Sequence, residues 1–141
     1  INYKTQKVGE ALRAACPNGI DVYFENVGGA ILEAVLSQIN LRARIAVCGM
    51  ISTYNASDPV PGPRNLGALI QNRARMEGFL VSDYAARFPE AAKDLIAWHV
   101  AGKIKYRLDV VDGLKNAPSA LVRLFNGGNQ GKLLVAVSPE P

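Results

Sequence analysis

The sequence contains little of what a disulfide-rich or metal-binding protein needs. Its 141 residues include two cysteines, Cys16 and Cys48, and one histidine, His99. Two cysteines cannot form a disulfide framework, and with a single histidine they do not provide a plausible zinc site. We therefore expect both thiols to be reduced and packed as small apolar side chains, and we expect no bound metal. His99 is expected to be a packed helix residue.

Long apolar runs are also missing. No stretch approaches the roughly 20 consecutive apolar residues that a membrane-spanning helix requires. The chain does not open on the basic and apolar segments of a secretory signal. These absences argue against a membrane or secreted protein, and we expect a cytoplasmic one. The content of 49% hydrophobic and 20% charged residues is ordinary for a soluble globular domain.

The charge is positive but lacks any clustering. Lysine and arginine outnumber aspartate and glutamate by 16 to 12, which gives a net charge of +4. The basic residues are spread along the chain with acidic residues between them, and they form no basic stripe. We therefore expect no nucleic-acid partner.

The first residues read as a continuation of something longer. Ile1-Asn2-Tyr3-Lys4 contains no initiating methionine and has the pattern of a strand end followed by a turn. We expect this chain to be a piece of a larger protein.

The first fifty residues alternate between helical and strand patterns. Apolar residues at helical spacing predict a helix over 7–15, followed by a strand over 20–24. The glycine pair at 28–29 then leads into an apolar helix over 30–39 and a short apolar strand over 44–48. A strand, helix and strand in this order predict a βαβ unit and a parallel sheet.

The rest of the chain continues the mixed pattern. It predicts a proline-rich loop or lid at 55–64, a helix at 66–72 capped by Asn65 and an edge strand at 76–81. A helix opened by Pro89 and ended by Gly102 follows, with Ala92, Leu95, Ile96 and His99 on one side. The last predicted elements are a strand at 104–111 with one solvent-exposed face, a helix at 114–125 and a strand at 132–137.

Polar side chains directly follow the strand at 44–48. Ser52, Thr53, Tyr54 and Asn55 come after its carboxyl end, where open α/β sheets bind their ligands. Glycines at the ends of two strands would let a flat ligand approach the backbone without a Cβ in the way. Because several strand ends of one parallel sheet face the same crevice, the sequence predicts a binding site at this edge.

Several runs resemble a known family, and together they cover essentially the whole chain. They are Asn2-Tyr3-Lys4, Asp21-Val22-Tyr23-Phe24-Glu25-Asn26-Val27-Gly28-Gly29, Arg44-Ile45-Ala46-Val47-Cys48-Gly49, Ile51-Ser52-Thr53-Tyr54-Asn55, Arg75-Met76-Glu77-Gly78-Phe79, Gly102-Lys103-Ile104 and Gly128-Asn129-Gln130-Gly131-Lys132. These runs resemble the zinc-independent medium-chain dehydrogenase/reductases, in particular the group of prostaglandin reductases, 2-alkenal reductases and curcumin reductases.

The resemblance implies an α/β fold, a partial Rossmann-like doubly wound parallel sheet whose first two strands are missing, plus a C-terminal α+β segment. Residues 1–103 would be the C-terminal part of the NADP-binding domain. Residues 104–141 would complete the substrate (GroES-like) domain of the parent protein. The edge strand from Met76 to Val81 would join two subunits into a homodimer. The glycine-rich phosphate turn of the family would precede residue 1.

The resemblance also implies an NADPH-dependent reductase of the carbon–carbon double bond in α,β-unsaturated ketones and aldehydes. Its partners would be NADP and a small enone or enal. Tyr54 would be the catalytic residue. By the same likeness, the cofactor contacts would be Tyr3, Asn26, Cys48, Gly49, Met50, Ile51, Ser52, Thr53, Tyr54, Phe79, Leu80, Val81 and Asn129.

A phenol suits this reaction. Hydride delivered to the β-carbon of an enone moves negative charge onto the carbonyl oxygen, and a fixed O–H donor stabilises that charge. A tyrosine is protonated at neutral pH and can donate such a hydrogen bond. The cofactor supplies the redox chemistry, so no metal is needed.

Other interpretations remain open at this point. Tyr54 could be a half-buried loop residue, and Ser52 and Thr53 could serve as turn-forming hydroxyls. The chain could belong to a non-catalytic nucleotide-sensing or interaction module, or to a quinone reductase of the same superfamily. The fragment alone is expected to be inactive and to bind NADPH weakly or not at all.

Overall fold

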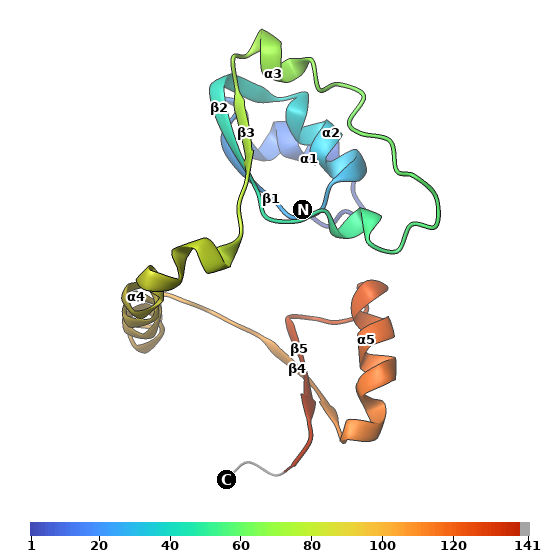
Figure 1. Cartoon of the computed structure of the whole chain (residues 1–141), viewed down its shortest axis with the longest axis vertical. Helices are drawn as coiled ribbons and strands as arrows, with labels where there is room; N and C mark the ends of the chain where they lie inside the picture. Colours follow the sequence, from blue (N-terminus) through green and yellow to red (C-terminus); the bar gives the residue numbers. More distant parts are fainter. Residues whose placement is uncertain (139–141) are drawn as a thin grey trace. The chain divides into compact units, whose positions relative to one another are not determined.

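The computed structural model describes residues 1–138 and divides into two compact units (Figure 1). The first unit comprises Ile1–Ala85 and the second begins at Ala86. The predicted functional division at residues 103 and 104 stays a prediction.

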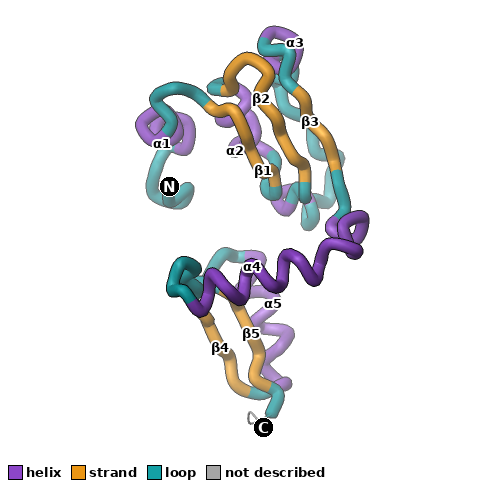
Figure 2. Tube along the Cα trace, turned by 90° about the vertical axis from the view of Figure 1, so that its left-hand side faces the viewer, coloured by secondary structure: helices purple, strands orange, loops and turns teal. Residues whose placement is uncertain are grey.

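The first unit is built on a parallel sheet of three strands in the order β1-β2-β3 (Figure 2). Its strands are β1 (Ile20–Glu25), β2 (Ile39–Val47) and β3 (Arg75–Gly78). The carboxyl ends of the three strands are level, because Val47 pairs with Glu25 on one side and with Gly78 on the other. The predicted α/β class with a parallel sheet is therefore confirmed, and three strand ends meet at one edge.

Two helices, α1 (Val8–Ala15) and α2 (Gly29–Leu36), supply the packing for this sheet. The core of the unit consists of Ile20, Leu32, Val35, Leu36, Ile39, Ala43 and Ile45. Leu12 of α1 packs against this cluster from the side. The opposite face of β1 is open, with Val22 and Phe24 exposed by 64% and 58%.

The second strand begins earlier than its apolar run indicated. The helix predicted to reach Ile39 ends at Leu36, and Ile39 already pairs with Ile20 in the sheet. The next pair is Val22 with Arg44, so β2 contains extra residues at this step. Arg42 has a positive φ of 61° within this irregular stretch. The sequence there has the pattern of a turn, which hid the start of the strand.

Two further predictions in this unit were wrong in detail. The short helix α3 (Ala68–Gln71) begins after Gly67, and the Asn65 side chain does not cap it. The edge strand stops at Gly78, because the chain turns into the 3-10 helix η2 (Val81–Arg87). Residues 55–63 form no helix or strand, as the proline content predicted.

The second unit contains a parallel pair of strands, β4 (Leu108–Asp112) and β5 (Lys132–Ala136). Its other elements are α4 (Phe88–Val100), the short 3-10 helix η3 (Leu114–Asn116) and α5 (Ala117–Phe125). The helix predicted at 114–125 is thus split into a 3-10 turn and an α-helix at Pro118.

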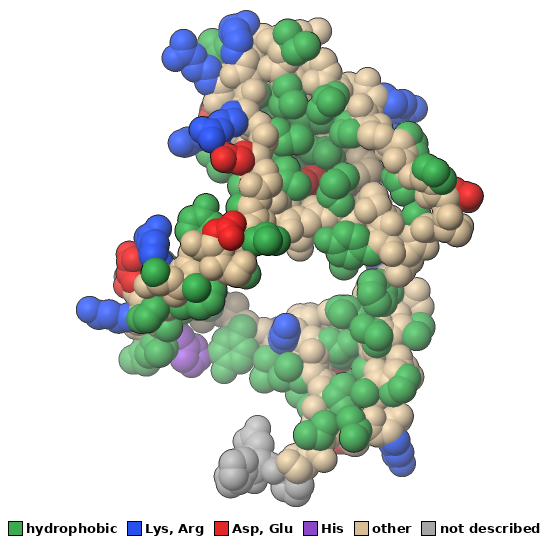
Figure 3. All heavy atoms as spheres, viewed as in Figure 1, with side chains coloured by type: hydrophobic (Ala, Val, Ile, Leu, Met, Phe, Trp, Pro, Cys, Tyr) green, Lys and Arg blue, Asp and Glu red, His purple; other side chains and the backbone are tan. Residues whose placement is uncertain are grey.

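The apolar side of α4 is exposed. The side chains that the helical spacing placed on one face include Leu95 and Ile96, which are 51% and 63% exposed. None of the residues of α4 is buried. Hydrophobic side chains are also exposed over α5 (Figure 3). His99, which was expected to be a packed helix residue, lies on α4 and is exposed, and its ring packs beside that of Tyr106 at 5.3 Å between centroids.

The wet face of β4 is the opposite of the predicted one. Leu108 and Val110 are exposed, whereas Asp109 is half-buried. The Asp109 carboxylate accepts hydrogen bonds from the Gln130 backbone N–H at 2.9 Å and from the Arg123 guanidinium at 2.6 Å. These contacts, first the Gln130 hydrogen bond and then the Arg123 charge, lower the pKa of Asp109. The face that alternation assigned to solvent is therefore the covered one, and an ion pair between Asp109 and Arg123 lies on it.

Candidate functional site

The candidate site lies where β1 and β2 end. The backbone N–H groups of Cys48 and Gly49 donate to the Glu25 carbonyl at 2.8 and 3.3 Å. Farther along, Ile51 donates to the Asn26 carbonyl at 3.2 Å and Ser52 to the Val27 carbonyl at 3.0 Å. The segments 25–27 and 48–52 are therefore joined by their main chains beyond the sheet itself.

Gly49 is the point where the predicted site residues meet. A Cβ at this position would lie 2.6 Å from Asn26 Oδ1 and 2.8 Å from the Tyr54 hydroxyl oxygen. Atoms do not approach a Cβ so closely, so any larger residue at position 49 would displace one or both of these side chains. The structure therefore brings Asn26, Gly49 and Tyr54 together, as the sequence predicted for the level ends of parallel strands.

The phenol of Tyr54 is oriented by the backbone of its own turn. The Met50 N–H donates to the Tyr54 hydroxyl oxygen at 3.2 Å. Because the phenol oxygen accepts this bond, its own hydrogen stays available to a ligand. The side chain is 62% exposed, so a ligand has access to it.

The turn that carries Tyr54 is the 3-10 helix η1 (Ile51–Thr53). Thr53 closes it, because its backbone N–H and its hydroxyl both donate to the Met50 carbonyl, at 2.9 and 2.8 Å. Ser52 Oγ lies near Gly28, 3.2 Å from where a Cβ on that residue would stand. The hydroxyl of Thr53 thus serves the turn, in line with the alternative left open for it.

Glu25 is a site residue that the sequence pattern did not reveal. It is the last residue of β1 and is 0% exposed. Its Oε1 accepts the N–H groups of Val27 at 2.5 Å and Gly28 at 2.8 Å, just before α2 begins. Peptide N–H groups at a helix start favour a negative charge, which offsets part of the cost of burying the carboxylate. The position of Glu25 in the sequence, between a strand and a glycine turn that precedes a helix, was the signal that could have indicated this role.

Tyr23 stands two residues before Glu25 and therefore points to the same face of β1. Burial, followed by the negative charge of Glu25, raises the pKa of Tyr23 to about 12. This phenol stays neutral over the whole physiological range.

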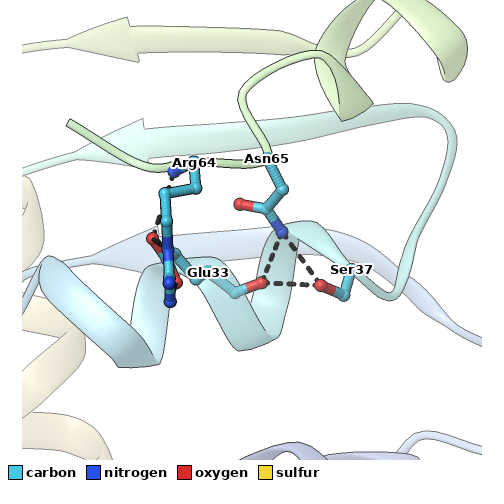
Figure 4. Close-up of polar contacts among 4 residues, drawn as sticks. All are labelled: Glu33, Ser37, Arg64 and Asn65. Carbon is cyan, nitrogen blue, oxygen red and sulfur yellow. Dashed lines mark hydrogen bonds and ion pairs between the residues drawn. The ribbon is translucent and has the colours of Figure 1, made fainter.

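Hydrogen bonds and an ion pair connect the C-terminal end of the proline-rich loop to α2 (Figure 4). The Arg64 guanidinium pairs with the Glu33 carboxylate at 2.9 Å, and the Arg64 backbone N–H donates to Glu33 Oε1 at 3.1 Å. Asn65 Nδ2 donates to the Glu33 carbonyl at 2.8 Å and to Ser37 Oγ at 2.9 Å. We call this set of four residues the loop anchor. The Arg64 side-chain and backbone hydrogen bonds lower the pKa of Glu33 to about 2.

The residues after β3 follow the third strand end at the same edge of the sheet. Phe79 donates its backbone N–H to the Val47 carbonyl at 3.3 Å. Its ring packs edge-on against Phe24 at 6.0 Å and against Tyr84 at 6.1 Å between centroids. Leu80 and Val81 follow with exposed side chains. Their role in binding a cofactor stays a prediction.

Among the described residues, Tyr3 and Asn129 make no hydrogen bond to this cluster, and Cys48 is joined to it through its backbone N–H alone. Tyr3 lies in a turn, 59% exposed, where a strand end was expected. Asn129 belongs to the second unit, where its Nδ2 donates to the Gly131 carbonyl at 2.8 Å. Cys48 is a free, exposed thiol, so its expected use as a buried apolar group was wrong, whereas Cys16 packs partly against the core.

Within the described residues, no group of three or more histidine, cysteine, aspartate or glutamate side chains could hold a metal ion. No helix found in residues 1–138 has the length and apolar character needed to cross a bilayer.

Comparison with known families matches residues 1–98 to the family described as zinc-binding dehydrogenase. The chain belongs to the zinc-binding dehydrogenase family. The match covers the entire first unit, including both strand ends of the candidate site.

Two of the named relatives of the chain are reductases. It is 52% identical over 141 residues to a 2-alkenal reductase (NADP(+)-dependent) of Nicotiana tabacum, covering 99% of this chain and 41% of that protein. It is 41% identical over 143 residues to the NADPH-dependent curcumin reductase of Escherichia coli, covering 98% of this chain and 41% of that protein. These relatives confirm the resemblance seen in the sequence.

A solved structure matches the whole of this chain. The crystal structure of CurA from Vibrio vulnificus in complex with NADPH superposes with a TM-score of 0.89 at 42% identity, covering 100% of this chain and 43% of CurA. The chain therefore spans about two fifths of the length of the relatives that it matches.

Proposed function

We propose that this chain is the C-terminal, cofactor-binding part of an NADPH-dependent reductase that saturates the carbon–carbon double bond of α,β-unsaturated ketones and aldehydes. The observation that carries the proposal is the meeting of Asn26, Gly49 and Tyr54 at the level ends of β1 and β2. Identity above 40% to a 2-alkenal reductase and to a curcumin reductase supports the same chemistry.

The residues present fit a nicotinamide cofactor. Because Gly49 has no Cβ, the Asn26 amide and the Tyr54 phenol both come close to the main chain there, and together they offer polar atoms to a ligand at the strand ends. NADPH would supply the hydride for the β-carbon of the substrate. The residues proposed to hold NADPH are Tyr3, Asn26, Cys48, Gly49, Met50, Ile51, Ser52, Thr53, Tyr54, Phe79, Leu80, Val81 and Asn129.

Tyr54 is proposed to bind the substrate carbonyl oxygen. Its oxygen is engaged by the Met50 N–H, and so its proton points away from that bond toward a ligand. As the double bond is reduced, negative charge collects on the carbonyl oxygen, and the phenol hydrogen bond stabilises that charge. The proton that finally reaches the α-carbon comes from solvent or from a group outside this cluster.

The proposal includes a zinc-independent reaction, because the chemistry needs a hydride donor and a hydrogen-bond donor. It also includes a homodimer formed through the Met76 to Val81 segment, whose strand part ends at Gly78, a cytoplasmic location and a small-molecule substrate. The exposed backbone edge of β3 supports such a dimer, because β3 pairs with β2 on one side of the described sheet.

A chimera tests the function. The chain replaces the matching C-terminal segment of the Nicotiana tabacum 2-alkenal reductase, which supplies the remainder of the enzyme. NADPH oxidation is followed with an enone and with a quinone as substrates. We expect turnover of the enone. A folded chimera that binds NADPH but reduces the quinone alone would transfer the assignment to the quinone reductases, and one that reduces neither would indicate a non-catalytic module.

Tyr54→Phe in the chimera tests the catalytic residue. Loss of one hydrogen bond to a developing oxyanion lowers kcat by roughly 100-fold or more, while the NADPH dissociation constant changes little. Tyr106→Phe is the matched control, because Tyr106 is 65% exposed in the second unit. Equal kcat values for Tyr54→Phe and the unaltered chimera would remove Tyr54 from the chemistry.

A further inference from the structure

Glu25 is the one buried charged residue among those described, with 0% exposure. A carboxylate without water needs hydrogen-bond donors, because its desolvation is costly. The observed donors are the backbone N–H groups of Val27 and Gly28, both on Oε1. The side chain therefore bends back onto the turn that follows its own strand and fixes that turn.

The fixed turn is also the support of the second site segment. The carbonyls of Asn26 and Val27 accept the N–H groups of Ile51 and Ser52, which begin the 3-10 turn before Tyr54. The Glu25 carbonyl itself accepts two N–H groups from the end of β2. A displacement of the 26–28 turn would thus be passed on to the turn that orients Tyr54.

The second carboxylate oxygen, Oε2, is buried and has no hydrogen-bond partner among the described residues. A neutral glutamine at this position would keep the shape of the side chain but would lose the negative charge. It would also bury an amide whose second polar atom has no partner in its present surroundings. The carboxylate is therefore held by the two backbone N–H groups on Oε1 and by the neighbouring Tyr23 phenol, whose pKa is raised by burial, by the Glu25 charge and by a hydrogen bond to Glu25.

We propose that Glu25 is a positioning residue of the reductase site: its buried carboxylate holds the 26–28 turn, and through it places Asn26 and the turn that carries Tyr54. This inference rests on the proposed function for its catalytic consequence, but the structural coupling can be measured without turnover. It assigns a role to a residue that touches neither the substrate nor the cofactor.

The first experiment uses the chain itself, by NMR. In Glu25→Gln, the amide proton signals of Val27 and Gly28 shift upfield, because the charged acceptor is gone. Amide hydrogen exchange at Ile51 and Ser52 becomes faster by roughly 10-fold, the factor expected for loss of one charged hydrogen bond. Glu10→Gln is the control, since it makes the same chemical change at an exposed glutamate on α1.

The second experiment uses the chimera with the tobacco reductase. Glu25→Gln lowers kcat for the enone by roughly 10-fold at temperatures well below the melting temperature, with a smaller change in KM. Glu25→Asp keeps the carboxylate on a shorter side chain and restores part of kcat. This partial rescue also covers the case in which Glu25→Gln fails to fold.

The outcomes separate the two proposals. Unchanged exchange at Ile51 and Ser52 in Glu25→Gln would overturn the positioning role, as would a lower melting temperature with unchanged kcat. An unaltered chimera without enone reduction would overturn the proposed function, while the exchange data from the chain would still decide whether Glu25 places the turn.

Discussion

Gly49 determines how closely Asn26 and Tyr54 approach each other. Gly49→Ala is expected to push both side chains apart, because the added Cβ would stand 2.6 and 2.8 Å from their oxygen atoms. We expect at least a roughly 10-fold weaker NADPH affinity in the chimera, the scale of losing one well-placed hydrogen bond. Fluorescence titration measures this change.

Gly62→Ala is the control for that substitution. A Cβ on Gly62 would meet nothing within 4 Å. Equal affinities in the two alanine variants would show that the contact at Gly49 does not matter for the cofactor.

The proximity of Asn26, Gly49 and Tyr54 was predictable, because neighbouring parallel strands end at one edge. The function of Glu25 was not. An acidic residue at a strand end ordinarily faces water, and only the structure shows that the Glu25 side chain folds back to accept the N–H groups of Val27 and Gly28. Likewise, Asn65 has the residue type of a helix cap, but its side-chain amide donates instead to the Glu33 carbonyl and to Ser37 Oγ on α2.

At the scale of elements, the loop anchor gives the first unit a defined response to acid. The pKa of Glu33 is lowered from 4.5 to about 2 by the hydrogen bonds from Arg64. A lowered carboxyl pKa contributes stability that is present above pH 4.5 and is lost as the pH falls toward 2. Because the Arg64 side chain is 87% exposed, solvent screens the pair and the effect is local.

The measurement is an NMR titration of the Arg64 amide, whose N–H donates to Glu33. Its signal is expected to shift with a midpoint near the lowered pKa of about 2. In Glu33→Gln the shift disappears. An Arg64→Gln variant returns the midpoint toward the ordinary pKa of glutamate. A midpoint near 4.5 in the unaltered chain would contradict the anchor.

The edge of β3 allows a test of the proposed dimer. Phe79 donates to Val47, so alternation along the strand turns the Gly78 N–H away from β2. Gly78→Pro would remove an outward donor without breaking a bond to β2. We expect the chimera to become monomeric, as measured by light scattering, whereas Gly78→Ala stays dimeric. A proline variant that remains dimeric would move the interface elsewhere.

The elements themselves were predicted unevenly. Strong apolar runs located β1 and the end of β2, because a short β-rich apolar run is typical of a parallel strand, although one face of β1 is exposed here. The start of β2 was missed, since its extra residues and the positive φ of Arg42 resemble a turn. The β4 face was inverted, because an ion pair between Asp109 and Arg123 replaces apolar packing.

At the scale of the whole molecule, the chain is expected to bind NADPH poorly alone. It spans 41% of the tobacco relative. The family resemblance places the glycine-rich turn that cradles the pyrophosphate outside this chain, and helix N-termini supply much of the affinity for such phosphates. A titration of the isolated chain should show no sub-micromolar binding. Tight binding by the chain alone would contradict this expectation, and the chimera is the positive control.

The main-chain bonds between 25–27 and 48–52 have a consequence for protein engineering. Because the Glu25, Asn26 and Val27 carbonyls hold the second segment in place, neither segment keeps its conformation when moved by itself. Anyone who wishes to transplant this candidate site into another scaffold must exchange the two stretches together.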